Sequence, residues 1–180
     1  MDDIARQVDP IRRRAIAASP LPWTVERGSD GVAHIRTGRT DGESRLFVRR
    51  DLVPADNSDV EFIALARAAV PRLLGALECE DVASISEGEL DEIEAVVTAA
   101  SAAPWRPFIE EWEPIGGCSM IWIGDGDAPD MYVWLGDDIA PAPDIDFIGY
   151  SRQDVPVLIA EVRRRFSAVR ADESQGTTTC

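Results

Sequence analysis

DVEFIALARAAVPRLLGAL, residues Asp59 to Leu77, returns later in the chain as DIDFIGYSRQDVPVLIAEV, residues Asp144 to Val162. At a constant offset of 85 residues, the identical positions of the first stretch are Asp59, Phe62, Ile63, Arg67, Val70, Pro71 and Leu73. A second block agrees, because Val8 to Trp23 matches Leu90 to Trp105 at an offset of 82 and keeps the Ala-Ala-Ser run and the Pro-Trp pair. The sequence therefore predicts two tandem copies of one folding unit.

The length of one copy indicates that the two copies share a core. A unit of roughly 80 residues buries only about 60% of its unfolded surface, so it is marginal by itself. We expect residues 1–79 and 80–170 to be the two copies and to form one pseudo-symmetric domain. The polar residues 171–180 are expected to be a disordered tail.

Each copy is predicted to open with a helix. In the second copy Ser86 can cap a helix from Glu87 to Ala100, with Glu89 completing a capping box. Apolar residues at helical spacing give this helix one buried stripe, and Pro104 ends the pattern. The first copy repeats the stripe, although Pro10 requires its helix either to begin near Asp9 or to kink.

Short alternating runs after each opening helix predict strands. The clearest runs are Val32 to Arg36, Arg45 to Arg50, Ser119 to Gly124 and Met131 to Gly136. The spacers inside each pair are rich in Gly and Asp, as hairpin loops are. Weaker candidates are Trp23 to Arg27 and Arg106 to Glu113.

A closing helix is predicted to follow the strands of each copy. Its cap is expected at Asn57 or Ser58 in the first copy and at Asp144 in the second. Pro71 and Pro156 suit a first helical turn better than a helix interior, so each closing element is predicted to be two short helices.

These elements predict an α+β protein. Two α-β-β(-β)-α copies related by a pseudo-two-fold axis would form an antiparallel sheet packed with helices. Arg67 and Arg152, which the repeat makes equivalent, are expected to pair with acids such as Glu61 and Asp146.

The charge is unevenly distributed. The net charge is −15, and residues 80–148 hold 17 of the 33 acids against Arg106 alone. This excess argues against nucleic acid as a partner and allows a basic protein or a cation. It makes Glu110, Glu111 and Glu113 candidates for an acidic docking patch, although a solvated acidic surface that keeps the protein soluble is the simpler explanation.

No apolar run is long enough to span a membrane, and no signal-peptide pattern is visible. Cys79, Cys118 and Cys180 are widely spaced and odd in number, which favours free thiols in a reduced compartment. We expect a cytoplasmic protein, either a monomer or a homodimer.

The strands of the second copy separate aliphatic from aromatic side chains. Since side chains alternate along a strand, Trp122, Tyr132 and Trp134 share one face. Aligning the hairpins matches these rings with His34, Phe47 and Arg49 of the first copy. If helices do not cover this face, it suits a protein partner or a planar anion bound in a cleft between the copies. If helices do cover it, the rings belong to the core.

Catalytic and metal signatures are weak. Asp125, Asp127 and Asp130 offer hard oxygen ligands, but their spacing is not that of a calcium loop, and the Asp-Gly pairs favour a hairpin turn. His34 is the only histidine, and no nucleophile motif or phosphate loop accompanies it. No catalytic residue and no cofactor is therefore predicted.

The block Phe-Ile-x-x-x-Arg-x-x-Val-Pro-x-Leu, together with the Pro-Trp pair before it, resembles small actinobacterial and phage-encoded proteins of the Ead/Ea22-like kind. Their ending reads FIAAARxDVPxLL, and the second copy keeps its aspartate as Asp154 while the first has Ala69. The resemblance covers about 70 residues and implies a lineage and a mobile-element setting. It carries over no catalytic residue.

Three functions remain in competition at this point. The first is a non-catalytic cytosolic binding protein, of the inhibitor, immunity or adaptor type, that docks a protein partner. The second is a small-ligand sensor for a nucleotide-like planar anion. The third is a metal-assisted hydrolytic enzyme centred on the aspartate loop.

Overall fold

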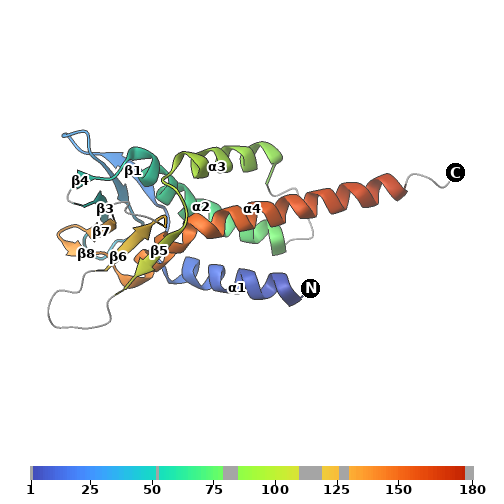
Figure 1. The fold of residues 1–180 in the computed structure, drawn as a ribbon, viewed down its shortest axis with the longest axis horizontal. Coiled ribbons are helices and arrows are strands. Elements are labelled where there is room, and N and C mark those ends of the chain that lie inside the picture. Colours follow the sequence, from blue (N-terminus) through green and yellow to red (C-terminus); the bar gives the residue numbers. More distant parts are fainter. Residues whose placement is uncertain (1, 52, 79–84, 110–118, 126–129, 177–180) are drawn as a thin grey trace.

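Helices gather on one side of a single antiparallel sheet in the computed structural model of this chain (Figure 1). The structure describes all residues except 1, 52, 79–84, 110–118, 126–129 and 177–180. The described residues form four helices and eight strands, which confirms the predicted α+β class. In chain order they are α1 (Asp2–Ala17), β1 (Thr24–Arg27), β2 (Ala33–Arg36), β3 (Arg45–Arg50), β4 (Val53–Pro54), α2 (Asn57–Glu78), α3 (Glu87–Ala99), β5 (Trp105–Phe108), β6 (Met120–Ile123), β7 (Met131–Leu135), β8 (Asp138–Ile139) and α4 (Ala142–Gly176).

The sheet has the order β1-β2-β3-β7-β6-β5, with β4 added to β3 and β8 added to β7. Its central ladder joins β3 to β7 and runs from Leu46 opposite Leu135 to Arg50 opposite Met131. The middle pair is Val48 opposite Val133, two residues that the offset of 85 makes equivalent. Each half of the chain contributes a helix, four strands and a helix in the same order. Tandem duplication stays our hypothesis for the origin of this order.

The core lies between the sheet and the helices, and its aromatic contacts cross from one half of the chain to the other. Phe62 of α2 meets Trp105 edge to face, with ring centroids 5.4 Å apart. Phe147 of α4 meets Trp23 in the same way at 5.8 Å. All four rings are buried, and a cis peptide bond precedes the proline before each tryptophan. Separating the halves would therefore expose both aromatic pairs.

Two buried aspartates also cross between the halves. Asp144 accepts hydrogen bonds from the backbone N–H and the hydroxyl of Ser19, at 2.6 and 2.7 Å. Asp59 accepts the same two bonds from Ser101, at 2.7 and 2.8 Å. Burial raises the pKa of the Asp144 carboxyl, while the two Ser19 donors act in the opposite direction.

The predicted partners of the two equivalent arginines are wrong. Arg67 donates to the carbonyl of Ser19 at 3.2 Å, and Arg152 donates to the carbonyl of Ser101 at 3.0 Å. Arg67 is buried, and its guanidinium binds the Ser19 carbonyl just after α1, which also accepts from the indole N–H of Trp23. The acid expected beside it, Glu61, lies near Arg27 instead.

The capping box is confirmed. Ser86 accepts from the backbone N–H of Glu89, and the Glu89 carboxylate accepts from the backbone N–H of Ser86. The predicted breaks at proline are wrong, because α2 continues through Pro71 and α4 continues through Pro156. A proline inside a helix costs about 3 kcal/mol, but the apolar faces buried on both sides of each proline favour an unbroken helix.

Both ends of the second half's closing helix also differ from expectation. α4 begins at Ala142, so Asp144 lies within its first turn and binds Ser19 rather than capping its own helix. The chain after Arg170, predicted to be disordered, continues as helix to Gly176. The physical reason is local, since no proline or glycine interrupts the helix between Pro156 and Gly176. α1 likewise begins at Asp2 and includes Pro10.

The six predicted strands form close to their predicted positions, except that the run from Arg106 to Glu113 forms β5 only as far as Phe108. Residues 110–113 lie outside the described part of the chain. The short strands β4 and β8 were not predicted, because a two-residue strand carries no alternating pattern. Each adds beside a central strand, β4 to β3 and β8 to β7.

Candidate functional site

The side of the sheet that faces away from the helices is the candidate site, and we call it the open face (Figure 1). Buried aliphatic residues such as Ile35, Val48 and Ile121 alternate along the strands with more exposed residues, so the buried ones define the helix-facing side. The side chains between them belong to the open face, and they are Glu26, His34, Arg36, Arg45, Phe47, Arg49, Arg106, Phe108, Met120, Trp122, Tyr132 and Trp134.

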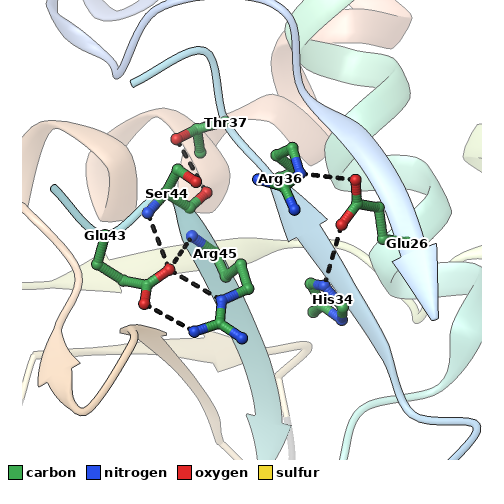
Figure 2. Close-up of polar contacts among 7 residues, drawn as sticks. All are labelled: Glu26, His34, Arg36, Thr37, Glu43, Ser44 and Arg45. Atoms are coloured by element: carbon green, nitrogen blue, oxygen red, sulfur yellow. Dashed lines mark hydrogen bonds and ion pairs between the residues drawn. The ribbon is translucent and has the colours of Figure 1, made fainter. Parts of the chain in front are cut away.

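The first half of the open face holds a polar cluster around Glu26 (Figure 2). The Arg36 guanidinium donates to Glu26 at 2.6 Å, and the His34 Nε2 atom lies 3.4 Å from the other carboxylate oxygen. The hydrogen bond from Arg36 is the main cause that lowers the pKa of Glu26. Glu26 therefore stays anionic at neutral pH and holds both partners in place across β1 and β2.

A second cluster lies at the start of β3. Glu43 accepts from the backbone N–H groups of Ser44 and Arg45, and it forms a two-pronged ion pair with the Arg45 guanidinium at 3.0 and 2.9 Å (Figure 2). The side-chain hydrogen bond of Arg45 comes first among the causes that lower the pKa of Glu43 to about 2. The ion pair fixes the direction of the Arg45 side chain on the open face.

Phe47 stands between these clusters. Its ring lies 5.4 Å from the His34 ring with a tilt of 31°, and the Arg45 guanidinium lies 5.9 Å from the ring centroid. Across the central ladder, Phe47 of β3 lies opposite Trp134 of β7, and Arg49 lies opposite Tyr132. The ring is therefore held by contacts on several sides.

A cleft of about 430 Å³ opens beside Phe47. It arises because β2 pairs with β3 only at Leu46 and Arg45, while β4 pairs with β3 only at Arg49 and Arg50. The Val48 carbonyl accepts from the backbone N–H of Ala55, directly after β4, so the cleft lies where this edge of β3 passes from β2 to β4. The residues that give the cleft its chemistry are Asp30, His34, Arg45, Phe47, Arg49 and Pro54.

The second half of the open face is aromatic. Phe108 of β5 and Trp122 of β6 stack with ring centroids 5.4 Å apart at 29°. They are 38% and 43% exposed, and Arg106 beside them binds Asp125 at 2.7 Å. Tyr132 and Trp134 of β7 are half-buried. This half offers rings, whereas the first half offers charges around one ring.

The predicted site residues thus divide into groups. His34, Phe47 and Arg49 line one cleft within the first half, whereas Trp122, Tyr132 and Trp134 do not line it. By the strand registers, the residue of the first half that corresponds to Trp122 is Arg36 and not the predicted His34. His34 lies two residues before Arg36, on the same face of β2. Glu110, Glu111 and Glu113, predicted as an acidic patch, lie outside the described residues.

The aspartate loop does not assemble a metal site in the part of the chain that the structure describes. Asp125 is ion-paired with Arg106, and the backbone carbonyl of Asp130 accepts from Asp51. Asp127 lies outside the described residues. Within the described ranges no group of three or more His, Cys, Asp or Glu side chains is placed to hold a metal ion.

Sequence reasoning missed several open-face residues that matter. Glu26, Arg36 and Arg45 fix His34 and Phe47, and Phe108 forms the stack with Trp122. Their alternation with buried aliphatic neighbours was the signal that could have found them. It was weak for Glu26, Arg36 and Phe108 because each of their strands is only four residues long.

No family model, curated protein or solved structure matches the chain. The likeness to Ead/Ea22-like proteins therefore stays a prediction. None of the helices that the structure describes combines the length and apolar character that crossing a bilayer requires.

Proposed function

We propose that this protein is a non-catalytic binding protein, of the inhibitor, immunity or adaptor type, and that a protein partner binds the open face of its sheet. The stacked and exposed pair Phe108 and Trp122 carries the proposal. Both rings are exposed, and they lie on the face of β5 and β6 opposite the buried Trp105, Ile121 and Ile123. Aromatic side chains are enriched at the centres of protein interfaces and supply much of their binding energy.

The charges around the rings favour a partner that contributes apolar groups at the centre of the contact. Arg106 is already paired with Asp125, and Arg36 is already paired with Glu26. Such pairs form a polar rim that adds specificity more than affinity. The net charge of −15 attracts a basic protein over longer distances, so the proposed partner has a basic surface around an apolar contact.

Catalysis receives less support from the described residues. The polar partner of His34 is Glu26, and no serine or cysteine side chain is hydrogen-bonded to the imidazole within the described ranges. The metal-assisted hydrolytic alternative needs free carboxylates at the aspartate loop, where Asp125 is ion-paired. A cytoplasmic location remains part of the proposal.

The test uses the full chain as bait in an extract of its native host. We expect a partner that the wild type retains to be lost at least ten-fold with Trp122→Ser. The matched control is Ile16→Ser, because Ile16 is 75% exposed on α1, on the opposite side of the sheet. Equal retention by the two variants, checked with the purified partner, would contradict docking on the open face.

A further inference from the structure

The Phe47 cleft, defined by Asp30, His34, Arg45, Phe47, Arg49 and Pro54, has properties that docking of a protein partner at Trp122 does not explain. It is concave, and its volume of about 430 Å³ is within the range of about 300–1,000 Å³ that is usual for small-molecule sites. Trp122 and Phe108 do not line it. The cleft is therefore a separate feature of the same face.

The lining of the cleft carries two cations, Arg45 and Arg49, and one anion, Asp30. Arg49 is exposed and makes no hydrogen bond or ion pair with the residues that the structure describes. Arg45 is fixed by Glu43, and Asp30 already accepts a hydrogen bond from the backbone N–H of Val32. Arg49 is thus the cation left to bind an incoming anion.

The ring in the cleft is pre-positioned. Phe47 is held by His34 at 5.4 Å and by Arg45 at 5.9 Å, and His34 is in turn held by Glu26. Figure 2 shows Glu26, His34 and Arg45 on three neighbouring strands, with His34 turned towards Glu26 and Arg45 turned towards Glu43. Stacking of a planar ligand on Phe47 therefore costs little conformational entropy of the protein, because the ring is already held in place.

We propose that the Phe47 cleft binds a small molecule that combines a planar ring with an anionic group, the ring stacking on Phe47 and the anion pairing with Arg49. The whole-chain charge of −15 selects against a polyanion, so a single small anion fits better than a nucleic acid strand. This site goes beyond the proposed partner docking and uses different residues.

The experiment is isothermal titration calorimetry on the full chain with three probes of this class: adenosine monophosphate, flavin mononucleotide and 4-hydroxybenzoate. We expect at least one to bind with a dissociation constant below about 1 mM and to raise the melting temperature at saturation. Adenosine and inorganic phosphate, which each carry half of the recognised chemistry, are expected to bind at least ten-fold more weakly than adenosine monophosphate if that is the probe bound.

Variants locate the site. Arg49→Gln and Phe47→Leu are each expected to weaken binding of the probe at least ten-fold. Arg106→Gln, which removes a cation from the same face in the second half, is expected to leave the affinity for the probe unchanged. Circular dichroism checks that Phe47→Leu remains folded, and Arg49 is exposed, so its replacement leaves the core intact. Failure of all three probes, or equal weakening by Arg106→Gln, overturns the proposal.

The two proposals fail separately. Loss of ligand binding leaves partner capture through Trp122 untouched, and loss of partner capture leaves the titrations unchanged. A probe whose affinity depends on Trp122 but not on Arg49 would overturn the cleft as its site.

Discussion

Single residues decide how closely the helices approach the sheet. Gly149 lies within α4, where a Cβ atom would come within 2.7 Å of the Pro107 ring of β5. Gly75 lies within α2, and a Cβ atom there would meet nothing within 4 Å. The same residue type therefore has a packing role at one position and none at the other.

We expect Gly149→Ala and Gly75→Ala to change stability in opposite directions. Alanine favours a helix over glycine by up to about 1 kcal/mol, so Gly75→Ala should raise the free energy of unfolding. At Gly149 the clash with Pro107 should outweigh this gain and lower it by about 1–3 kcal/mol. Urea denaturation followed by tryptophan fluorescence measures both. A stabilised Gly149→Ala variant would show that α4 and β5 can move apart freely.

Sequence could not distinguish these two glycines. Each stands in an amphipathic stretch with similar neighbours, and the difference is the distance to Pro107, which lies 42 residues away along the chain. By contrast, the aliphatic residues of the same two helices could be placed in the core from their spacing alone.

At the level of elements, α3 depends on its cap. Ser86 and Glu89 exchange hydrogen bonds at its first turn, and Arg72 of α2 donates to the same Glu89 carboxylate at 2.6 Å. The hydrogen bond from Arg72 and those from Ser86 lower the pKa of Glu89 to about 2. One carboxylate therefore joins the cap of α3 to the side of α2.

The sign of the pH dependence follows from this lowered pKa. A carboxyl whose pKa is lower in the folded state adds stability above its ordinary value of 4.5, and that stability is lost as the pH falls towards about 2. We expect Glu89→Gln to make the free energy of unfolding less dependent on pH between 4.5 and 2. Glu92→Gln on the exposed side of α3 is the control, and it should keep the dependence of the wild type. Parallel curves for wild type and Glu89→Gln would contradict the role of the cap.

The other elements show where local signals suffice. The capping box lies within four consecutive positions, so the sequence could specify it. The prolines within α2 and α4 carry an equally strong local signal, yet it fails because buried residues such as Val70 and Val155 hold both helices against the core.

At the scale of the whole molecule, the halves are joined by one central ladder and by contacts that cross between them. Asp144 in α4 binds Ser19 of the first half, and Asp59 in α2 binds Ser101 of the second. Both carboxylates are fully buried. The halves should therefore unfold together.

We expect Asp59→Ala and Asp144→Ala each to lower the free energy of unfolding by at least about 2 kcal/mol. Each change removes the acceptor of a serine N–H and hydroxyl, those of buried Ser19 or of half-buried Ser101, and an unsatisfied buried group costs about 1–3 kcal/mol. Asp137→Ala, at an exposed turn, is the control. Urea denaturation should show one transition for all the variants. A large loss in only one of the two buried variants would contradict equivalent roles for the halves.

The sequence by itself determined the α+β class, the capping box and the alternation that separates aliphatic from aromatic strand faces, because these depend on residues that are neighbours along the chain. Tertiary structure decided the rest. Only the folded chain leaves the open face without a helix among its described elements, pairs Asp144 with Ser19, and opens the Phe47 cleft where one edge of β3 passes from β2 to β4. These features depend on distances between residues far apart in sequence, and local patterns do not encode such distances.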